Sequence, residues 1–231
     1  MQTSRDWNVI LDQAAFMQDY GHTYARVLRR PGMAEIFDAT FREAADLVEP
    51  AVAWNYFPVQ EMRHEQVIVA GGRRIGNGPV TTVMGGADQL AIGVCTIGPK
   101  LPARSHEYRD RGEAVRGMLL DQLGSLAVGQ LSQLFYRQLE MDAASQGLHI
   151  STYLSPGESE WSVKDQAVIF DLLDATQIGV SLTESLLMKP IKSLSLMAGI
   201  GRHPMGVPGA THCDYCTMAD RCPFHGKHGS L

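Results

Sequence analysis

The sequence predicts an α+β fold in which long helices pack against short antiparallel strands. Between Gly112 and Gly147 apolar residues recur every three to four positions, which is typical of a buried helix. The segments 51–59 and 66–75 are instead short and rich in β-branched and aromatic residues, and Gly71-Gly72 interrupts the second as a hairpin turn would. Long helices beside hairpin-linked strands are typical of the α+β class.

Two segments near these elements extend the same pattern. Residues 32–48 carry apolar side chains on one helical face, which predicts an amphipathic helix. Residues 89–98, which include Cys95, form a short apolar run bounded by glycine and predict a buried strand. The helical region 112–147 is either one helix or two joined at Gly124, because each internal glycine weakens an isolated helix by up to ~1 kcal/mol. Close approach of another backbone would explain such glycines.

The region after the long helix predicts a turn, a short helix and a hairpin. Pro156-Gly157 marks the turn, and Ser162 followed by Asp165 matches a capping box that starts a helix over about residues 163–173. Farther on, serine and threonine alternate with apolar residues on both sides of the proline-containing turn 189–192, at Ser181, Thr183, Ser185, Ser193 and Ser195. We expect these two segments to pair as a hairpin with one polar face.

The composition limits the classes of partner. The chain of 231 residues has a formal charge of -5 and 45% apolar residues, so it offers no global basic field for nucleic acid. A protein or a small molecule is the expected partner. No apolar run approaches the ~18 residues of a membrane span, and the first ten residues lack the pattern of a signal peptide, so we expect a cytoplasmic location without membrane association.

A cysteine cluster near the end of the sequence predicts a metal site. Three of the four cysteines follow the pattern Cys213-x2-Cys216-x5-Cys222-Pro. A chain of this length needs no disulfide to stabilise its core, and in a reducing compartment cysteines at short spacing are more often metal ligands or redox groups. An iron–sulfur cluster held by three cysteines would leave one iron for another ligand. The candidates are His212, Asp214, His225, Cys95 and an external ligand.

Two other interpretations of the cluster stay open at this point. Zinc bound by the three cysteines and either His225 or His212 would form a tetrahedral structural site. Alternatively, the histidine-rich tail binds no metal. The residues after 201 are rich in glycine and proline and lose apolar periodicity, so the order of this tail has to come from another source, such as a bound metal.

The order of several segments resembles the reactivation domain of cobalamin-dependent methionine synthase, and in particular its short stand-alone relatives with a terminal cysteine motif. These segments are "CTIGPKL", "LLDQLGSLAVGQL", "LSPGESEW" and "FDLLDATQIGVSLTESLLMKPIKSLSLMAGIG". The most specific part is Leu182-Thr183-Glu184-Ser185, which is followed by a proline-containing turn and a serine-bearing strand. The resemblance extends over about residues 24–201.

The resemblance implies a mixed fold around a bent antiparallel sheet, with residues 1–201 as the reactivation-like domain and 202–231 as a metal-binding tail. In the family this domain binds S-adenosylmethionine and helps to return an inactive Co(II) corrinoid to use. An electron is delivered, and the methyl group of S-adenosylmethionine captures the Co(I) state. This redox task favours an iron–sulfur cluster over zinc in the tail, because zinc carries no electron.

The resemblance also implies cofactor-binding residues. In the long methionine synthases the turn before the capped helix reads Arg-Pro-x-Pro-Gly-Tyr, whereas Tyr153 and Glu158 take the places of that arginine and tyrosine here. The loss of the arginine removes the usual bidentate partner of a carboxylate. Glu184 and Ser185 match the family motif, and a carboxylate beside a sulfonium or amino group is electrostatically favourable.

Together these features predict an activator or accessory protein for a corrinoid-dependent methyltransferase. Its expected partners are a corrinoid protein and an electron donor. Two alternatives stay open: a non-catalytic binding module whose tail holds structural zinc, and a methyltransferase that acts on an acceptor other than cobalt.

Overall fold

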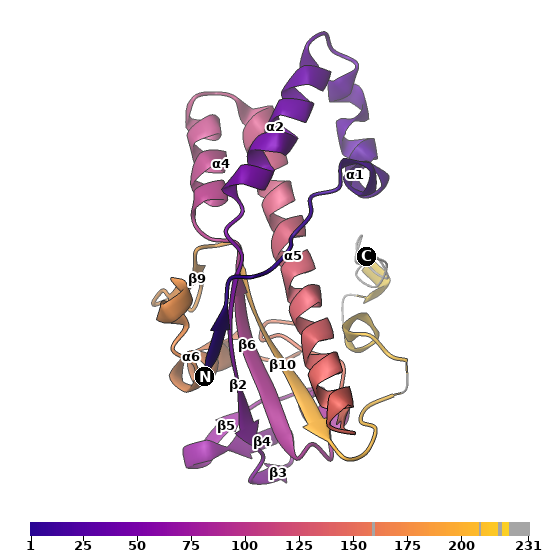
Figure 1. The fold of residues 1–231 in the computed structure, drawn as a ribbon, viewed down its shortest axis with the longest axis vertical. Coiled ribbons are helices and arrows are strands. Elements are labelled where there is room, and N and C mark those ends of the chain that lie inside the picture. The colour runs from indigo at the N-terminus through magenta and orange to yellow at the C-terminus, as the bar shows by residue number, and fades with distance from the viewer. Residues whose placement is uncertain (159, 208, 217–218, 222–231) are drawn as a thin grey trace.

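The α+β class is confirmed. A computed structural model describes residues 1–158, 160–207, 209–216 and 219–221 (Figure 1). At its centre lies a five-stranded antiparallel sheet in the order β1-β2-β6-β10-β7. The strands are β1 (Gln2–Ser4), β2 (Ala51–Pro58), β6 (Gln89–Thr96), β7 (His149–Ile150) and β10 (Ser193–Gly201).

Four helices build the core on one face of this sheet. They are α1 (Gln13–Leu28), α2 (Met33–Leu47), α4 (Lys100–Asp110) and α5 (Ala114–Ser145). Figure 1 shows α1, α2 and α4 gathered at one end of the molecule, with α5 running from that end along the sheet. The predicted long helix is therefore one continuous helix of 32 residues, without a break at Gly124.

Glycines allow these close contacts. A Cβ atom on Gly93 of β6 would lie 2.3 Å from the Phe135 ring of α5, so the helix packs directly on the sheet at this point. A Cβ on Gly117 would lie 2.9 Å from the carbonyl oxygen of Ser105 in α4, which confirms a close backbone approach there. Gly129 has no such neighbour within 4 Å.

A second layer covers the other face of the sheet. It contains the three-stranded sheet β3 (Glu61–Arg63), β4 (Gln66–Val69) and β5 (Arg73–Ile75), together with helices α3 (Val80–Met84) and α6 (Gln166–Leu172). The short 3-10 turn η1 (Ala70–Gly72) joins β4 to β5, and both of its glycines have positive φ, as the predicted hairpin turn requires.

The two layers explain the apolar sequence of β6. Ala91 and Cys95 contribute to the core under the helices, whereas Leu90, Ile92 and Val94 contribute to the core of the second layer. Because both faces are covered, side chains on both sides of the strand are apolar, and the alternation of a half-exposed strand is absent.

The predicted hairpin at 181–196 was wrong in its pairing. The first segment forms only β8 (Ser181–Leu182), which pairs with β9 (Met188–Lys189), while the second segment is β10 and pairs with β6. Its serines are buried and satisfied internally: Ser193 Oγ donates to Thr96 Oγ1 at 2.9 Å, and Ser195 Oγ donates to Gln166 Oε1 at 3.0 Å. Internal hydrogen bonds, not solvent, therefore explain the polar alternation in β10.

The capping box at Ser162 forms only in part. The Ser162 side chain accepts from the Lys164 backbone N–H, and the 3-10 turn η2 (Val163–Asp165) then leads into α6. Asp165 does not reach back to Ser162. Its Oδ2 accepts at 2.7 Å from both the Trp161 indole N–H and the Gly76 backbone N–H, so it joins this segment to the second layer.

Short 3-10 turns account for the remaining regular structure: η3 (Ala175–Ile178), η4 (His212–Tyr215) and η5 (Ala219–Arg221). The tail leaves the end of β10 and returns beside α5, on the side away from α4 (Figure 1).

Candidate functional site

The predicted turn at Pro156-Gly157 is present and rigidly held. The Glu158 backbone N–H donates to the Ser155 carbonyl at 3.1 Å, and Gly157 has φ +95°, as the third position of a type II turn requires. The Gly157 N–H donates to the Trp161 carbonyl at 2.8 Å. These bonds close a compact loop between residues 155 and 161.

Backbone hydrogen bonds attach this loop to the central sheet. Leu154 and Met197 of β10 exchange two N–H···O bonds of 2.9 Å each. The loop thereby lies beside β10 and α5, and a cleft of about 80 Å³ forms among the three segments. Its lining residues are Gly129, Ser132, Gln133, Tyr153, Ser155, Glu158, Leu194, Ser195 and Leu196.

Tyr153 and Glu158 therefore share one cleft. The Tyr153 ring packs against the Tyr136 ring of α5, with centroids 5.1 Å apart. Burial first, and the nearby Glu158 carboxylate second, raise the pKa of Tyr153 to about 12. Burial of its carboxylate also raises the pKa of Glu158, although the residue as a whole is exposed, and its side chain hydrogen-bonds that of Ser155.

The side chains that line the cleft are uncharged except for the carboxylate of Glu158. Hydroxyls come from three serines and a tyrosine, an amide comes from Gln133, and the residues that line the cleft include no lysine or arginine. The cleft can therefore donate and accept hydrogen bonds, but it offers no bidentate cation for a ligand carboxylate.

Two of the predicted cofactor residues lie elsewhere. Glu184 and Ser185 are exposed in the loop between β8 and β9, and neither lines the cleft. Ser185 Oγ lies 3.0 Å from Thr183 Oγ1, which also accepts from the Leu187 backbone N–H at 3.1 Å. Thr183 and Ser185 thus have a local structural role in the loop between β8 and β9. The four predicted cofactor-binding residues therefore lie in two regions of the structure.

Two of the predicted thiol ligands lie on one turn of the tail. Cys213 lies within η4 and Cys216 directly follows it, and the Cys216 N–H donates to the Cys213 carbonyl at 3.1 Å. Both residues are half-buried. Cys213 also contributes, after burial and Glu158, to the raised pKa of Tyr153. Cys213 is therefore within electrostatic range of Tyr153, which lines the cleft.

The other predicted ligands divide into three cases. Cys222 and His225 lie outside the described residues, and for His212 only the backbone is described. Asp214 accepts from the Thr211 backbone N–H at 2.6 Å and from the Thr211 hydroxyl at 2.8 Å, so its carboxylate caps η4. In the described part of the chain, no group of three or more His, Cys, Asp or Glu side chains is gathered as a metal site.

Cys95 does not fit the proposed fourth-ligand position. Its side chain is fully buried in the apolar core between β6 and the helices, and this burial raises the pKa of its thiol. A metal ligand has to be a thiolate, which such burial disfavours. Cys213 and Cys216 are half-buried and lie on a single turn, and thiolates are ligands that a soft metal prefers.

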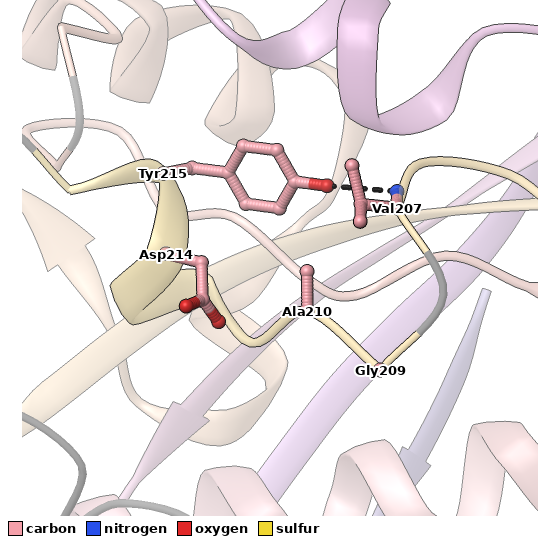
Figure 2. Close-up of a pocket in the computed structure, with 5 residues that line it drawn as sticks. All are labelled: Val207, Gly209, Ala210, Asp214 and Tyr215. Atoms are coloured by element: carbon pink, nitrogen blue, oxygen red, sulfur yellow. Dashed lines mark hydrogen bonds between the residues drawn. The ribbon is translucent and has the colours of Figure 1, made fainter.

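Tyr215 holds the cysteine turn against the body of the fold. The Val207 backbone N–H donates to its hydroxyl at 3.0 Å, and its ring packs against the core of the second layer. Figure 2 shows this bond and the hollow of about 330 Å³ that Tyr215 and Asp214 line with the loop at Val207, Gly209 and Ala210. The tail therefore obtains order from a half-buried aromatic ring, a source that the glycine-rich sequence did not suggest.

Sequence reasoning missed the contribution of α5 to the cleft. Gly129, Ser132 and Gln133 are spaced three to four apart, so they share one helical face. Small and polar residues that interrupt an apolar helical stripe were the available sign of a cavity.

Comparison with known proteins identifies the fold. No family model and no curated protein matches the chain. Among solved structures, one described as the crystal structure of the MetH reactivation domain bound to AdoHcy is similar, with a TM-score of 0.55 and 14% sequence identity. The match covers 88% of this chain and 73% of that one. At this identity the likeness shows the fold alone. It agrees with the mixed α+β architecture that the sequence resemblance predicts.

None of the helices in the described part of the chain combines the length and the hydropathy that a membrane span requires.

Proposed function

We propose that the protein is an accessory protein for a corrinoid-dependent methyltransferase and supports the reduction of an inactive Co(II) corrinoid to Co(I). Its partners are the corrinoid protein and a one-electron donor protein. In this proposal Cys213, Cys216 and Cys222 hold an iron–sulfur cluster, and the surface around the Tyr153 cleft meets the corrinoid protein.

One observation carries the proposal. Cys213, on the turn that also presents Cys216, is near enough to Tyr153 of the cleft to raise its pKa. A redox centre serves a partner best when it lies next to the surface where the partner docks. The similarity to the MetH reactivation domain supports a corrinoid partner, because that domain shares the fold.

The proposed reaction transfers one electron and no atoms. The donor protein is oxidised by one electron, and the cobalt is reduced from Co(II) to Co(I). An iron–sulfur cluster on the three cysteines would supply one-electron transfer close to the protein surface. The chain itself contributes the turn that presents two thiols, the Tyr215 anchor, and a docking surface with one carboxylate at Glu158.

S-adenosylmethionine does not fit the cleft as it stands. The volume of about 80 Å³ is well below the ~300 Å³ at which sites for ligands of this size begin. The lining also lacks a cation for the carboxylate of the amino acid part. We therefore give S-adenosylmethionine no role in the proposed reaction. Whether the protein binds S-adenosylmethionine distinguishes our proposal from a methyltransferase with a non-cobalt acceptor.

The first test is the metal and acid-labile sulfide content of the full chain purified without oxygen, with its electron paramagnetic resonance spectrum. We expect iron with matching sulfide, lost in Cys213→Ser, Cys216→Ser and Cys222→Ser. Cys95→Ala is the matched control and should keep the cluster, because Cys95 is enclosed in the core. Stoichiometric zinc without a redox-active signal would contradict the proposal and favour a binding module with a structural zinc tail.

The second test uses the reduced protein and a corrinoid methyltransferase in the Co(II) state. We expect the visible absorbance of Co(I) to appear only when the intact chain and an electron donor are both present. Saturable binding of S-adenosylmethionine together with methylation of an acceptor without cobalt would replace this function by that of a methyltransferase.

A further inference from the structure

A groove lies on the outward face of the three-stranded sheet, away from the central sheet. The register pairs Arg63 with Gln66, and Ile68 with Arg74, so these four side chains share one face of the sheet. The groove has a volume of about 680 Å³, within the range of small-molecule sites. Polar and cationic side chains surround a single aliphatic residue, Ile68.

Arg74 supplies an available cation. The preceding residue, Arg73, points to the opposite face and forms an ion pair with Asp171 at 3.2 Å. Arg63 forms an ion pair with Glu61. Arg74 has no ion pair or hydrogen bond among the residues that the structure describes. Its guanidinium can therefore present its donors to an anion that enters the groove.

Neutral donors surround this cation. Asn77 accepts from the Ser162 backbone N–H at 2.8 Å through its Oδ1, which directs the amide NH2 group away from that bond and leaves its two donors for the groove. His64 stands at the rim with φ +54°, a conformation that favours glycine. Its imidazole adds a polar group at the edge of the groove.

This arrangement suits a phosphorylated small molecule. A guanidinium binds phosphate oxygens in a bidentate manner, and amide N–H groups add hydrogen bonds to the remaining oxygens. The aliphatic Ile68 side chain offers contact to a non-polar part of the same molecule. Glu65 also lines the groove, and its carboxylate weakens the binding of an anion, which limits the expected affinity.

We propose that the groove on the outward face of the β3–β4–β5 sheet binds an organic phosphate, with Arg74 as its principal anion-binding residue. This site is independent of the cysteine tail and of the Tyr153 cleft, because its residues come from the second layer. The proposal therefore stands or fails separately from the proposed function.

The test compares AMP with adenosine as probes, by isothermal titration and by changes in the amide NMR spectrum of the full chain. We expect saturable AMP binding in the millimolar range or tighter, with shifts at residues 63–77, and at least about tenfold weaker binding of adenosine. In Arg74→Gln the affinity for AMP should fall by about tenfold, because the bidentate contact is lost.

Arg73→Gln is the matched control, since it removes the adjacent arginine on the opposite face. It should leave AMP affinity unchanged, and Glu65→Gln should increase it. Equal binding of AMP and adenosine, no saturable binding of AMP, or an equal loss in Arg73→Gln and Arg74→Gln would overturn the proposal. Native circular dichroism of each variant separates these outcomes from unfolding.

Discussion

The body of the fold and the tail that follows it are stabilised in different ways. Residues 1–201 form two apolar cores, one on each face of the central sheet. The described tail adds no core of its own, and its order depends on isolated contacts such as the Val207 bond to Tyr215 and the Thr211–Asp214 cap. Burial of apolar area supplies most folding free energy, so the tail depends on the body far more than the body depends on the tail.

The cysteines show what this difference means for chemistry. Cys95 belongs to the body and serves as a small apolar residue in a closed core. Cys213 and Cys216 belong to the tail and are only half-buried. A reactive or metal-binding thiol needs access and a stable thiolate. The same residue type is therefore enclosed in the core of one region and half-exposed on a turn of the other.

The largest expected effect is the difference in labelling rate between the cysteines of the tail and Cys95, measured on the metal-free chain under native conditions. Cys213 and Cys216 should react with a maleimide at rates near those of the unfolded chain. Cys95 should react at least about 10³-fold more slowly, because its exposure requires global opening of the core. Mass spectrometry of peptides gives each rate. Fast labelling of Cys95 without denaturant would contradict the closed core.

A substitution at the contact between the sheet and α5 should weaken the body selectively. In Gly93→Val the new side chain would collide with Phe135, so we expect a loss of about 3 kcal/mol or more in the free energy of unfolding. Urea denaturation measures this change.

The control for that substitution is Gly129→Ala, at a glycine of α5 that lines the cleft and has no close neighbour. Its new methyl group meets no atom within 4 Å, so it should stabilise α5 by up to about 1 kcal/mol. Similar losses in both variants would show that the contact with Phe135 is not the cause.

The smallest expected effects concern the ionisation of Tyr153, which Cys213 of the tail influences. Because the folded chain raises the pKa of Tyr153 from 10 to about 12, the unfolded phenol ionises first as pH rises. Stability should therefore be unaffected by Tyr153 below about pH 10 and fall by about 1–2 kcal/mol between pH 10 and 12. Urea denaturation across this range should show a shallower fall in Tyr153→Phe.

The tail contributes to the same titration. Cys213→Ser should lower the pKa of Tyr153 slightly, since Cys213 is a lesser cause of the shift after burial and Glu158. The difference in phenolate absorbance between this variant and its Tyr153→Phe derivative measures that pKa. An unchanged pKa of Tyr153 would show that Cys213 does not act on the cleft. The proposed function would then lose the observation on which it rests.

Local sequence patterns were sufficient for several elements. The spacing of apolar residues predicted α2, β6 and α5, and the dipeptides Gly71-Gly72 and Pro156-Gly157 predicted their turns. Each depends on interactions within a few residues, where helical or alternating periodicity and the φ preference of glycine act directly.

The same local patterns did not predict which distant segments pair with each other. The serines of β10 resembled the polar face of a hairpin, but β6, about a hundred residues earlier in the chain, is the strand that pairs with them. Asp165 matched a capping box and instead accepts from Trp161 and Gly76. A polar residue can satisfy its hydrogen bonds with a local or a distant partner, and sequence spacing alone does not distinguish the two.

Local periodicity and residue chemistry were enough to predict the fold class, the main helices and strands, and the cysteine-rich character of the tail. Contacts between distant segments instead place Tyr153 and Glu158 in one cleft with α5, bring Cys213 within electrostatic range of Tyr153, enclose Cys95 in the core and leave Arg74 facing a groove. These outcomes depend on which surfaces become buried together, and burial is decided by the packing of segments far apart in the chain.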